Sequence, residues 1–389
     1  MVHRVGQSLF ASLAVGLMRL MYIHTVAIPA PQANTVHVMR MAEAFSQLGH
    51  EVEVITPSGA AGVSDVYAHY GVARTFKLTP LAPFARKGRG QARVFAAVAA
   101  LAARLRSPDL VYTRDPLTAE LTTMLGLDTV LELHVPPSAF GTGTQTACRR
   151  LIGRTRLKRL VVISKALAAL VRRDLPGIES AGADVAVAHD GAVAGPPPPA
   201  KSSAGRLTAA YVGSFYQGRG IDVLLALARR TPEVDYRLIG ASTEDLARHR
   251  ADADALSNVT IEAAVPPASV TAELRSADVL LAPYQRELAV AGGGPSTSDY
   301  CSPLKVFEYM AAGRPMVISD LPVLREVLRP DATAVLVPPD DLDAWVSAVR
   351  GLAADPERRS RIGAAARTEL IASHTWKARA TEVLVGLGL

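Results

Sequence analysis

The sequence predicts an α/β protein of two similar halves, each a parallel sheet with helices on both faces. Short runs rich in Val, Ile and Leu alternate with helical stretches along most of the 389 residues, which is typical of βαβ units. Near the middle, the stretch GPPPPAKSSAGR (195–206), with its run of prolines, cannot continue a strand or a helix. The alternation then resumes, so we expect two Rossmann-like domains that face each other across a cleft.

The first domain is predicted to span residues 18–195, before a linker at 196–206. Its expected strands lie at 22–28, 51–55, 109–113, 129–133, 159–164 and 184–188. Its expected helices lie at 35–48, 91–106, 116–125 and 165–173. Gly49 supports the end of the first helix, because glycine commonly follows the last helical turn.

The second domain is predicted to span residues 207–374. Its expected strands lie at 207–213, 235–240, 259–263, 278–283, 315–319 and 332–338. Its expected helices lie at 220–230, 244–254, 268–275 and 303–312, and three more end the chain. Ser302 is predicted as the N-cap of the helix at 303–312, with Pro303 as its first residue.

Composition and charge narrow the function classes. The chain is 49% hydrophobic and 20% charged, and its two cysteines, Cys148 and Cys301, lie far apart. We expect no disulfide framework and no zinc site, and a reducing cytoplasm fits best. Residues 1–195 carry 21 Lys and Arg against 13 Asp and Glu, with basic clusters at 85–93 and 148–159. This favours an anionic membrane surface or an acidic substrate, with solvated helix faces as the alternative, and the lack of a nucleic-acid motif argues against nucleic acid.

Residues 1–17 are interpreted as a peripheral extension of the first domain. Their apolar run from Leu9 to Leu17 is too short to span a bilayer, and the buried strand expected next leaves no clear signal-peptide cleavage site. A short interfacial helix and a start of translation at Met18 or Met21 both stay open.

A glycine-rich turn is predicted after the first strand of the second domain. In VGSFYQGRG (212–220), Gly213, Gly218 and Gly220 allow a tight turn and a close approach of the backbone to a ligand. The helix that begins there can bind an anion with its free N–H groups. The spacing is near that of a P-loop but lacks its Ser or Thr, so two interpretations stay open. Either the turn holds phosphate with Arg219 as the cation, or it is a plain strand–helix turn.

Lys305 and Glu308 lie one helical turn apart near the start of the helix in CSPLKVFEYMAAG (301–313). Taken alone they would be a surface ion pair worth about 0.2–0.5 kcal/mol. In a binding site, Lys305 and the N-terminal amides would meet a nucleotide diphosphate, and Glu308 would accept hydrogen bonds from the ribose hydroxyls. The long connection at 284–300 would be a flap beside that site, or an ordinary surface loop.

These motifs, in this order, resemble those of the nucleotide-sugar glycosyltransferases of family 4. The most specific segment is SDYCSPLKVFEYMAAGRPMVISD, from Ser298. PQANTVHVMRMAEAFSQLGHEVEVIT (31–56) is similar to the family's first loop, helix and second strand, and VYTRDP, VLELHVP, VVISKAL and VAVAHDGAV to later segments of its first domain. The resemblance implies the GT-B fold, with a C-terminal helix, about 375–389, that packs back on the first domain.

The resemblance also implies roles for single residues. Glu308 matches the second glutamate of the family's E-x7-E signature and would hold the donor ribose. Arg219 and Lys305 would hold the donor diphosphate, and His134, in ELHVPPS, would lie beside the transferred sugar. Glu132, on the same strand as His134, is interpreted as structural. By composition alone, the alternatives to His134 are His24, His37 and His189.

The remaining candidate site residues surround these four. The loop from Pro31 to Thr35 would line the cleft floor, through Gln32, Ala33 and Asn34. The other nucleotide-binding candidates are Gly213, Ser214, Gly218, Ser302, Pro303 and Leu304.

Two positions depart from the family's pattern. Tyr300 replaces the first glutamate of the signature, so Asp299 and Tyr300 are the candidates that would face the donor sugar. Ser214 replaces the arginine that usually follows the Val-Gly pair.

The resemblance implies retaining, metal-independent transfer of a sugar from a UDP- or GDP-sugar to an acceptor hydroxyl, with no cofactor. A nucleotide-sugar epimerase and a non-catalytic glycosyltransferase-like partner protein are the alternatives. The acceptor is expected to be a lipid-linked glycan or a small molecule. A lipid-linked acceptor would place a cytoplasmic protein peripherally on the inner face of the membrane, where the basic first domain would meet anionic lipid.

Overall fold

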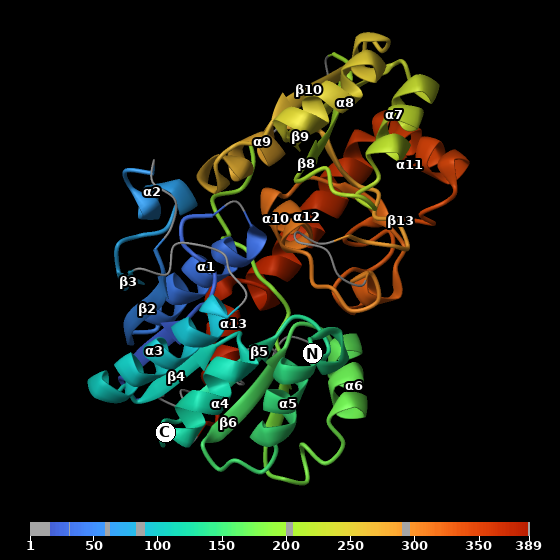
Figure 1. Ribbon diagram of the computed structural model, residues 1–389. Helices are drawn as coiled ribbons and strands as arrows, with labels where there is room; N and C mark the ends of the chain where they lie inside the picture. The colour runs from blue at the N-terminus through green and yellow to red at the C-terminus, as the bar shows by residue number, and fades with distance from the viewer. Residues whose placement is uncertain are drawn as a thin grey trace, which may run out of the picture.

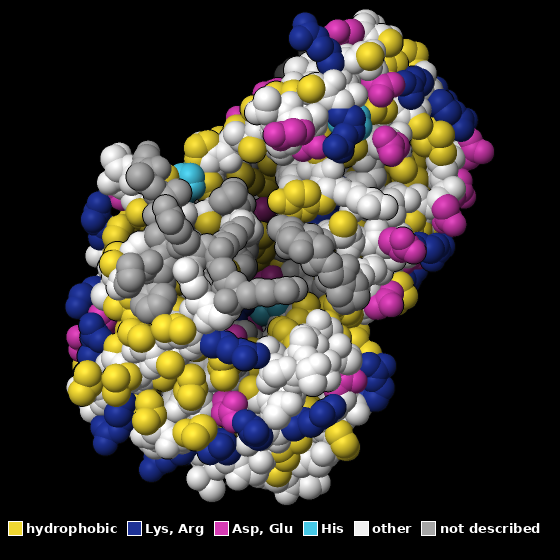
Figure 2. Space-filling view, viewed as in Figure 1, with side chains coloured by type: hydrophobic (Ala, Val, Ile, Leu, Met, Phe, Trp, Pro, Cys, Tyr) yellow, Lys and Arg dark blue, Asp and Glu magenta, His cyan; other side chains and the backbone are white. Residues whose placement is uncertain are grey.

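The computed structural model describes residues 16–30, 32–58, 63–82, 90–199, 205–289 and 296–387. Several segments singled out in the sequence fall wholly or partly outside these ranges. They are the extension 1–17, Pro31, the basic cluster 85–93, the linker 196–206 and the loop 284–300. The described chain forms two lobes, and the surface is hollowed where they meet (Figures 1 and 2).

The first lobe contains a parallel sheet of seven strands in the order β3-β2-β1-β4-β5-β6-β7. Its strands are β1 (Arg19–Ile23), β2 (Glu51–Pro57), β3 (Lys77–Leu81), β4 (Leu110–Thr113), β5 (Thr129–Leu133), β6 (Leu157–Val162) and β7 (Asp184–Val187). Every residue of β4 and β5 is buried, because helices cover both faces of a parallel sheet.

The helices of this lobe form two layers around its sheet. They are α1 (Ala33–Gln47), α2 (Val66–Tyr70), α3 (Gln91–Arg106), α4 (Pro116–Met124), α5 (Thr142–Leu151), α6 (Lys165–Asp174) and the 3-10 helix η1 (Pro137–Ala139). Helix α4 packs between α3 and α5. It begins sharply because Pro116 occupies its first turn and the Asp115 carboxylate accepts the N–H of Thr118.

The second lobe contains a parallel sheet of six strands in the order β10-β9-β8-β11-β12-β13. Its strands are β8 (Leu207–Val212), β9 (Val234–Ala241), β10 (Val259–Ala263), β11 (Val279–Ala282), β12 (Met316–Ser319) and β13 (Val335–Val337). Its helices are α7 (Ile221–Arg230), α8 (Thr243–Asp254), η2 (Pro267–Ser269), α9 (Val270–Ser276), α10 (Leu304–Ala312), η3 (Pro322–Glu326), α11 (Leu342–Ala354) and α12 (Pro356–Ser373).

The last helix, α13 (Trp376–Leu384), leaves the second lobe and packs against α1 in the first (Figure 1). Thr375 caps its start by accepting the N–H of Ala378. Arg159 of β6 donates hydrogen bonds to the carbonyls of Glu382 and Val383 at its end. Two facing Rossmann-like lobes and a helix that crosses back confirm the predicted fold class.

Some predicted elements differ from the observed ones. The first strand begins at Arg19 and ends at Ile23, earlier than the predicted 22–28. The sequence pattern missed α2, β3 and α5. Strand β3 contains Pro80 and lies at the sheet edge, where partial exposure weakens the apolar signal, and α5 has few apolar residues.

Candidate active site

Each sheet has a point where the strand order reverses, and the two points flank the contact between the lobes. The reversal lies between β1 and β4 in the first lobe and between β8 and β11 in the second. Ligands of open α/β sheets bind outside the carboxyl ends of the strands at such points. His24 and Arg114 directly follow β1 and β4, and Gly213 and Pro283 directly follow β8 and β11.

Direct hydrogen bonds join the two lobes behind these strand ends. Ser164 Oγ, which caps α6, donates to the carbonyl of Tyr300 at 2.8 Å. The Glu326 carboxylate accepts the N–H groups of Lys165 and Ala166 at 2.7 and 3.0 Å, where the helix dipole favours an anion. His189 Nε2 lies 2.9 Å from the same carboxylate. These contacts fix the relative positions of the lobes around the site.

The side-chain nitrogen of Lys305 is buried at the end of β8, and none of the described residues forms a hydrogen bond with it. It lies 3.4 Å from the centroid of the Tyr211 ring and against the Cα of Gly213, where an added Cβ would come within 2.6 Å of Nζ. A glycine with positive φ is therefore required for this approach. Burial and the nearby Arg219 hold the pKa of Lys305 well below its usual range, although Glu308 acts in the opposite direction.

Arg219 is the second cation of this corner of the site. Its Nε is buried and has no hydrogen-bond partner in the part of the chain that the structure describes. Its Cζ lies 5.3 Å from the centroid of the Tyr284 ring, and Lys305 Nζ lies 5.6 Å from the same centroid. The turn before it is tight, since the carbonyl of Gly218 accepts the N–H of Gln285 and an added Cβ on Gly218 would strike the Glu287 backbone. The predicted turn thus presents Arg219 beside Lys305.

Glu308 lies one turn further along α10 and is half-buried. Among the residues that the structure describes, it is not ion-paired with Lys305. Burial raises the pKa of its carboxyl, while Arg40 of α1 and Lys305 act in the opposite direction. Its carboxylate therefore faces the contact between the lobes rather than forming a surface pair.

The start of α10 differs from the prediction. Pro303 is the N-cap, Leu304 is the first helical residue, and no side chain caps the helix. The Oγ of Ser302, predicted as the cap, instead accepts the N–H of Asp190 at 3.0 Å across the lobes. No described side chain binds the first N–H groups of α10, and Leu304 packs against the core of the first lobe. Among the described residues, the Oγ of Ser214 has no hydrogen-bond partner, and its carbonyl accepts a hydrogen bond from the hydroxyl of Tyr211.

Tyr300 and Asp299 point in different directions. The Tyr300 ring is buried in the apolar cluster around β5, β6 and α6, and its hydroxyl has no hydrogen-bond partner there. Asp299 is exposed and accepts a hydrogen bond from Ser298. Of the two candidates for the donor sugar, only Asp299 presents a charged group to solvent.

In the first lobe, His134 follows β5 and hydrogen-bonds through Nε2 to Glu132. Glu132, which was interpreted as structural, lies against His134 because residues two apart in a strand share a face. Burial and Arg114 lower the pKa of His134 to about 4, despite Glu132. The imidazole is therefore neutral near pH 7, with Nε2–H donating to Glu132 and Nδ1 left as an acceptor.

Glu132 is the centre of a buried polar cluster that the sequence analysis did not find. Arg379 of α13 binds its two carboxylate oxygens at 3.1 and 3.2 Å, Tyr112 donates to it, and His37 Nε2 lies 3.0 Å away. Burial alone would raise its pKa, but Arg379 and the imidazoles hold the pKa of Glu132 well below its usual range. One ligand atom each from His37, Glu132 and His134 lie within 4.8 Å of one another, as in a metal site. Arg379 already neutralises the carboxylate, which disfavours a cation there.

The cleft loop places unpaired polar atoms beside this cluster. The side-chain oxygens of Gln32 and Asn34 are buried and have no hydrogen-bond partners within the described ranges, and Ala33 is exposed at the first position of α1. Arg114, after β4, donates to the carbonyl of Asn34 at 3.3 Å. Burial and Arg114 together lower the pKa of His24 to about 3. Arg114 is the cation of the first lobe's strand ends, which the sequence analysis missed.

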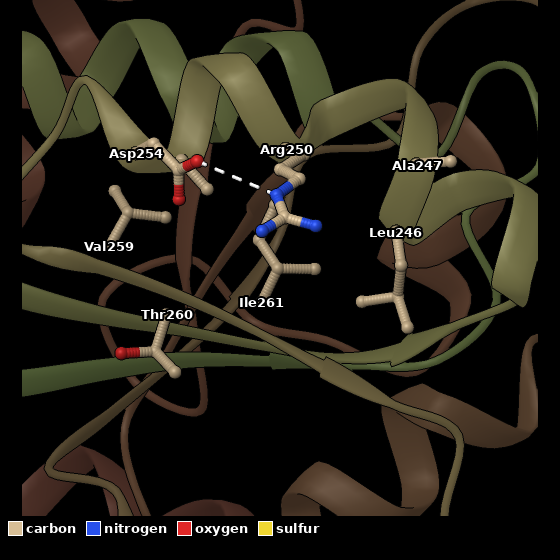
Figure 3. Close-up of a pocket in the computed structure, with 8 residues that line it drawn as sticks. Leu246, Ala247, Arg250, Asp254, Val259, Thr260 and Ile261 are labelled. Atoms are coloured by element: carbon tan, nitrogen blue, oxygen red, sulfur yellow. Dashed lines mark ion pairs between the residues drawn. The ribbon is translucent and has the colours of Figure 1, made fainter.

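A separate groove of about 530 Å³ lies between α8 and β10, at the far edge of the second sheet (Figure 3). Its lining contains no residue predicted for the site. Asp252 and Asp254, an Asp-x-Asp pair on α8, are bound to Arg229 and Arg250. A second Asp-x-Asp pair lies at the start of α11, where Asp341 caps the helix and Asp343 binds Arg230.

Two facing Rossmann-like lobes with paired cations at the strand ends of one lobe define a GT-B glycosyltransferase fold. A family model described as "Glycosyltransferase Family 4" matches residues 35–191, and one described as "Glycosyl transferase-like" matches residues 219–385. The chain belongs to glycosyltransferase family 4.

Curated relatives match part of the chain. Over 182 residues it is 31% identical to a phosphatidyl-myo-inositol mannosyltransferase of Mycolicibacterium smegmatis and 29% identical to one of Mycobacterium leprae. The match covers 46% of this chain in both cases, and 44% and 45% of the relatives. It thus spans less than half the length of each relative.

Solved structures share the fold at low identity. A sucrose-phosphate synthase from Thermosynechococcus elongatus has a TM-score of 0.71 at 18% identity, covering 93% of this chain and 96% of its own. Anabaena HepE in complex with UDP has a TM-score of 0.67 at 13% identity, covering 94% and 98%. No helix within the described residues has both the length and the hydropathy to cross a bilayer.

Proposed function

We propose that this protein is a hexosyltransferase that moves a sugar from a UDP- or GDP-sugar to an acceptor hydroxyl, with retention at the anomeric carbon and without a metal. Family membership and the activities for which its relatives are named support a hexosyl transfer. The choice of a nucleoside diphosphate donor is supported by UDP in the HepE complex and by the charges at the end of β8.

One observation carries the proposal: Lys305 and Arg219 lie together with buried, unpartnered nitrogen atoms. Keeping both groups charged without an anion is costly, because each has lost water and the two charges repel each other. A diphosphate would relieve both costs, and the free N–H groups at the start of α10 would add donors to it. Glu308, one turn along, would then accept the ribose hydroxyls.

The same groups would act in the reaction. The bond between the anomeric carbon and the diphosphate oxygen breaks, and the electron pair leaves with the diphosphate. Lys305 and Arg219 would stabilise that charge, which is typically the largest electrostatic contribution to catalysis. The acceptor hydroxyl bonds to the anomeric carbon on the same face and passes its proton to the departing diphosphate. Neutral His134 would use Nδ1 to accept a hydrogen bond from a sugar hydroxyl.

We take the acceptor to be lipid-borne, and the protein to work in the cytoplasm at the inner face of the membrane. The relatives named phosphatidyl-myo-inositol mannosyltransferase support a lipid headgroup as acceptor. The excess of Lys and Arg in residues 1–195 supports an anionic surface nearby.

The experiment is nucleotide release from a panel of UDP- and GDP-sugars, with and without phosphatidylinositol as a trial acceptor. We expect release of UDP or GDP from at least one donor, and loss of that release in Glu308→Ala but not in the surface control Glu233→Ala. A donor that is epimerised without release would instead identify an epimerase. Donor binding with neither release nor epimerisation would identify a non-catalytic protein.

A further inference from the structure

The outer face of α3 carries an apolar stripe of exposed side chains. Val94, Val98, Leu101 and Leu105 recur at helical spacing, and all are exposed, Leu101 by 55% and Leu105 by 79%. The opposite face of the helix is buried through Phe95 and a row of alanines. Helix α3 is therefore apolar on both sides, whereas a helix at a protein surface normally has one polar face.

Neighbouring residues extend this stripe. Met124 and Leu125 are exposed at the end of α4, which packs against α3. Leu17 is 80% exposed, and Arg19, two residues on, donates to the carbonyl of Ser107 at the end of α3. Figure 2 shows hydrophobic side chains gathered on the lobe that carries α3 and α4, with Lys and Arg side chains around them. Exposed apolar side chains gathered on one face in this way mark an interaction surface.

The charges around the stripe are mostly positive. Helix α3 contains no acidic residue, and Arg93, Arg104 and Arg106 are exposed along it. Arg93 reaches the start of α5, where an added Cβ on Gly143 would lie 2.7 Å from its guanidinium. Along α5, Arg149 and Arg150 are exposed as well, and Arg154, after its end, is half-buried.

This pattern fits an anionic surface better than a second copy of the chain. A pair of α3 helices would bring like charges together around the stripe, which is destabilising. Arginine stems can lie along apolar surface while their guanidinium groups reach lipid phosphates. Apolar residues in one stripe with cations beside them are the pattern of a helix that lies in the membrane interface.

We propose that the face formed by α3 and the end of α4, with the exposed arginines of α5, docks on an anionic lipid bilayer. Helix α3 begins on the carboxyl side of the sheet, where the candidate site lies, and runs away from it. A bilayer along the stripe would therefore meet the rim of the site at Val94. Docking itself does not depend on the proposed function. Only the purpose of docking, which is to bring a lipid-borne acceptor to that rim, rests on the proposed function.

The test is co-sedimentation of the full chain with vesicles of phosphatidylglycerol and phosphatidylcholine, against vesicles of phosphatidylcholine alone. We expect binding to the anionic vesicles at low salt, weakened at high salt. Leu101→Ser with Leu105→Ser should lower the partition coefficient by at least about tenfold. Arg104→Gln should lower it by about fivefold, the equivalent of about 1 kcal/mol for one cation. Ile371→Ser, at an exposed position on α12, is the matched control and should change nothing.

Several results would overturn the docking proposal. They are no binding of the unmodified chain to anionic vesicles at low salt, equal binding of the Leu101 and Leu105 double variant, or a dimer in solution that this variant disrupts. Nucleotide release from the donor in detergent-free solution is measured on the same samples. If release persists while vesicle binding is absent, only the docking proposal fails. If binding is as expected and release is absent, only the proposed function fails.

Discussion

Arg379 of the last helix binds both carboxylate oxygens of Glu132, at 3.1 and 3.2 Å, although 247 residues separate them in the sequence. Both side chains are almost completely buried. The guanidinium also donates to the carbonyl of His189, and Glu132 in turn holds His134 by its Nε2. The helix that crosses back from the second lobe therefore fixes the orientation of a histidine at the first lobe's strand ends.

Arg379→Met should destabilise the protein by about 3–5 kcal/mol, because it leaves the Glu132 carboxylate buried without its counter-charge. The measurement is the free energy of unfolding by urea denaturation. Arg350→Met, which removes an ion pair with Glu233 between two well-exposed side chains, is the control and should cost less than about 1 kcal/mol. A cost for Arg379→Met as small as that of the control would show that Glu132 does not depend on it. The double variant Glu132→Gln and Arg379→Met should cost less than the sum of the single changes.

Gly213→Ala should abolish UDP and GDP binding, since the new Cβ would force the Lys305 ammonium from its place. Gly205→Ala is a matched control, because Gly205 also has a positive φ but has open space around its Cα. Both variants carry backbone strain, so a difference in nucleotide affinity between them reports the contact with Lys305. Equal affinities in a calorimetric titration would separate Gly213 from the nucleotide site.

His134→Asn should make the free energy of unfolding less dependent on pH in the acid range. The folded protein keeps the imidazole neutral down to a pKa of about 4, whereas the unfolded chain takes up a proton near the ordinary value of 6.5. His134 thus contributes stability above pH 6.5 that is lost as the pH falls toward 4. The slope of unfolding free energy against pH in that window should drop by up to about 1.4 kcal/mol per pH unit. Burial raises the pKa of Asp190 to about 7 despite Arg379. Asp190 therefore gives the unfolding free energy a pH slope of the opposite sign, in the unmodified protein and in the variant alike. Identical slopes for the two proteins would contradict a depressed pKa for His134.

The fold was predictable from local sequence signals. Apolar strands, helix ends such as Gly49 and the proline stretch at 195–206 are each encoded within a few residues. Strand β3 was missed because an exposed edge strand with Pro80 lacks the continuous apolar run of a buried strand. Ser302 was misassigned for a related reason. Its local context suits a helix cap, but the N–H of Asp190, from the other lobe, takes the hydroxyl.

The candidate site was predictable only in part. Lys305, Glu308 and Arg219 lie in short motifs near strand ends, so spacing and resemblance were enough to select them. The pairing of Glu132 with Arg379 leaves no signal in the sequence, because nothing near either residue specifies a partner so far away. Arg114 was overlooked because its motif, VYTRDP, was quoted for other reasons. Its effect on the pKa of His134 depends on the distances between three strand ends, which the sequence does not contain.

The central claim is that the buried side-chain nitrogen of Lys305 receives the donor diphosphate and is protonated when it does. The most direct measurement is calorimetric titration of UDP and GDP at about pH 8.5, where the phosphate groups are fully ionised, in two buffers of different ionisation enthalpy. Burial and Arg219 depress the pKa of Lys305 in the free protein, and a bound diphosphate would raise it again. We therefore predict that nucleotide binding takes up a proton, weakens as the pH rises, and loses both its strength and its proton uptake in Lys305→Gln. Binding of equal affinity and equal proton uptake in that variant, or no binding of either nucleotide to the unmodified chain, would contradict the claim.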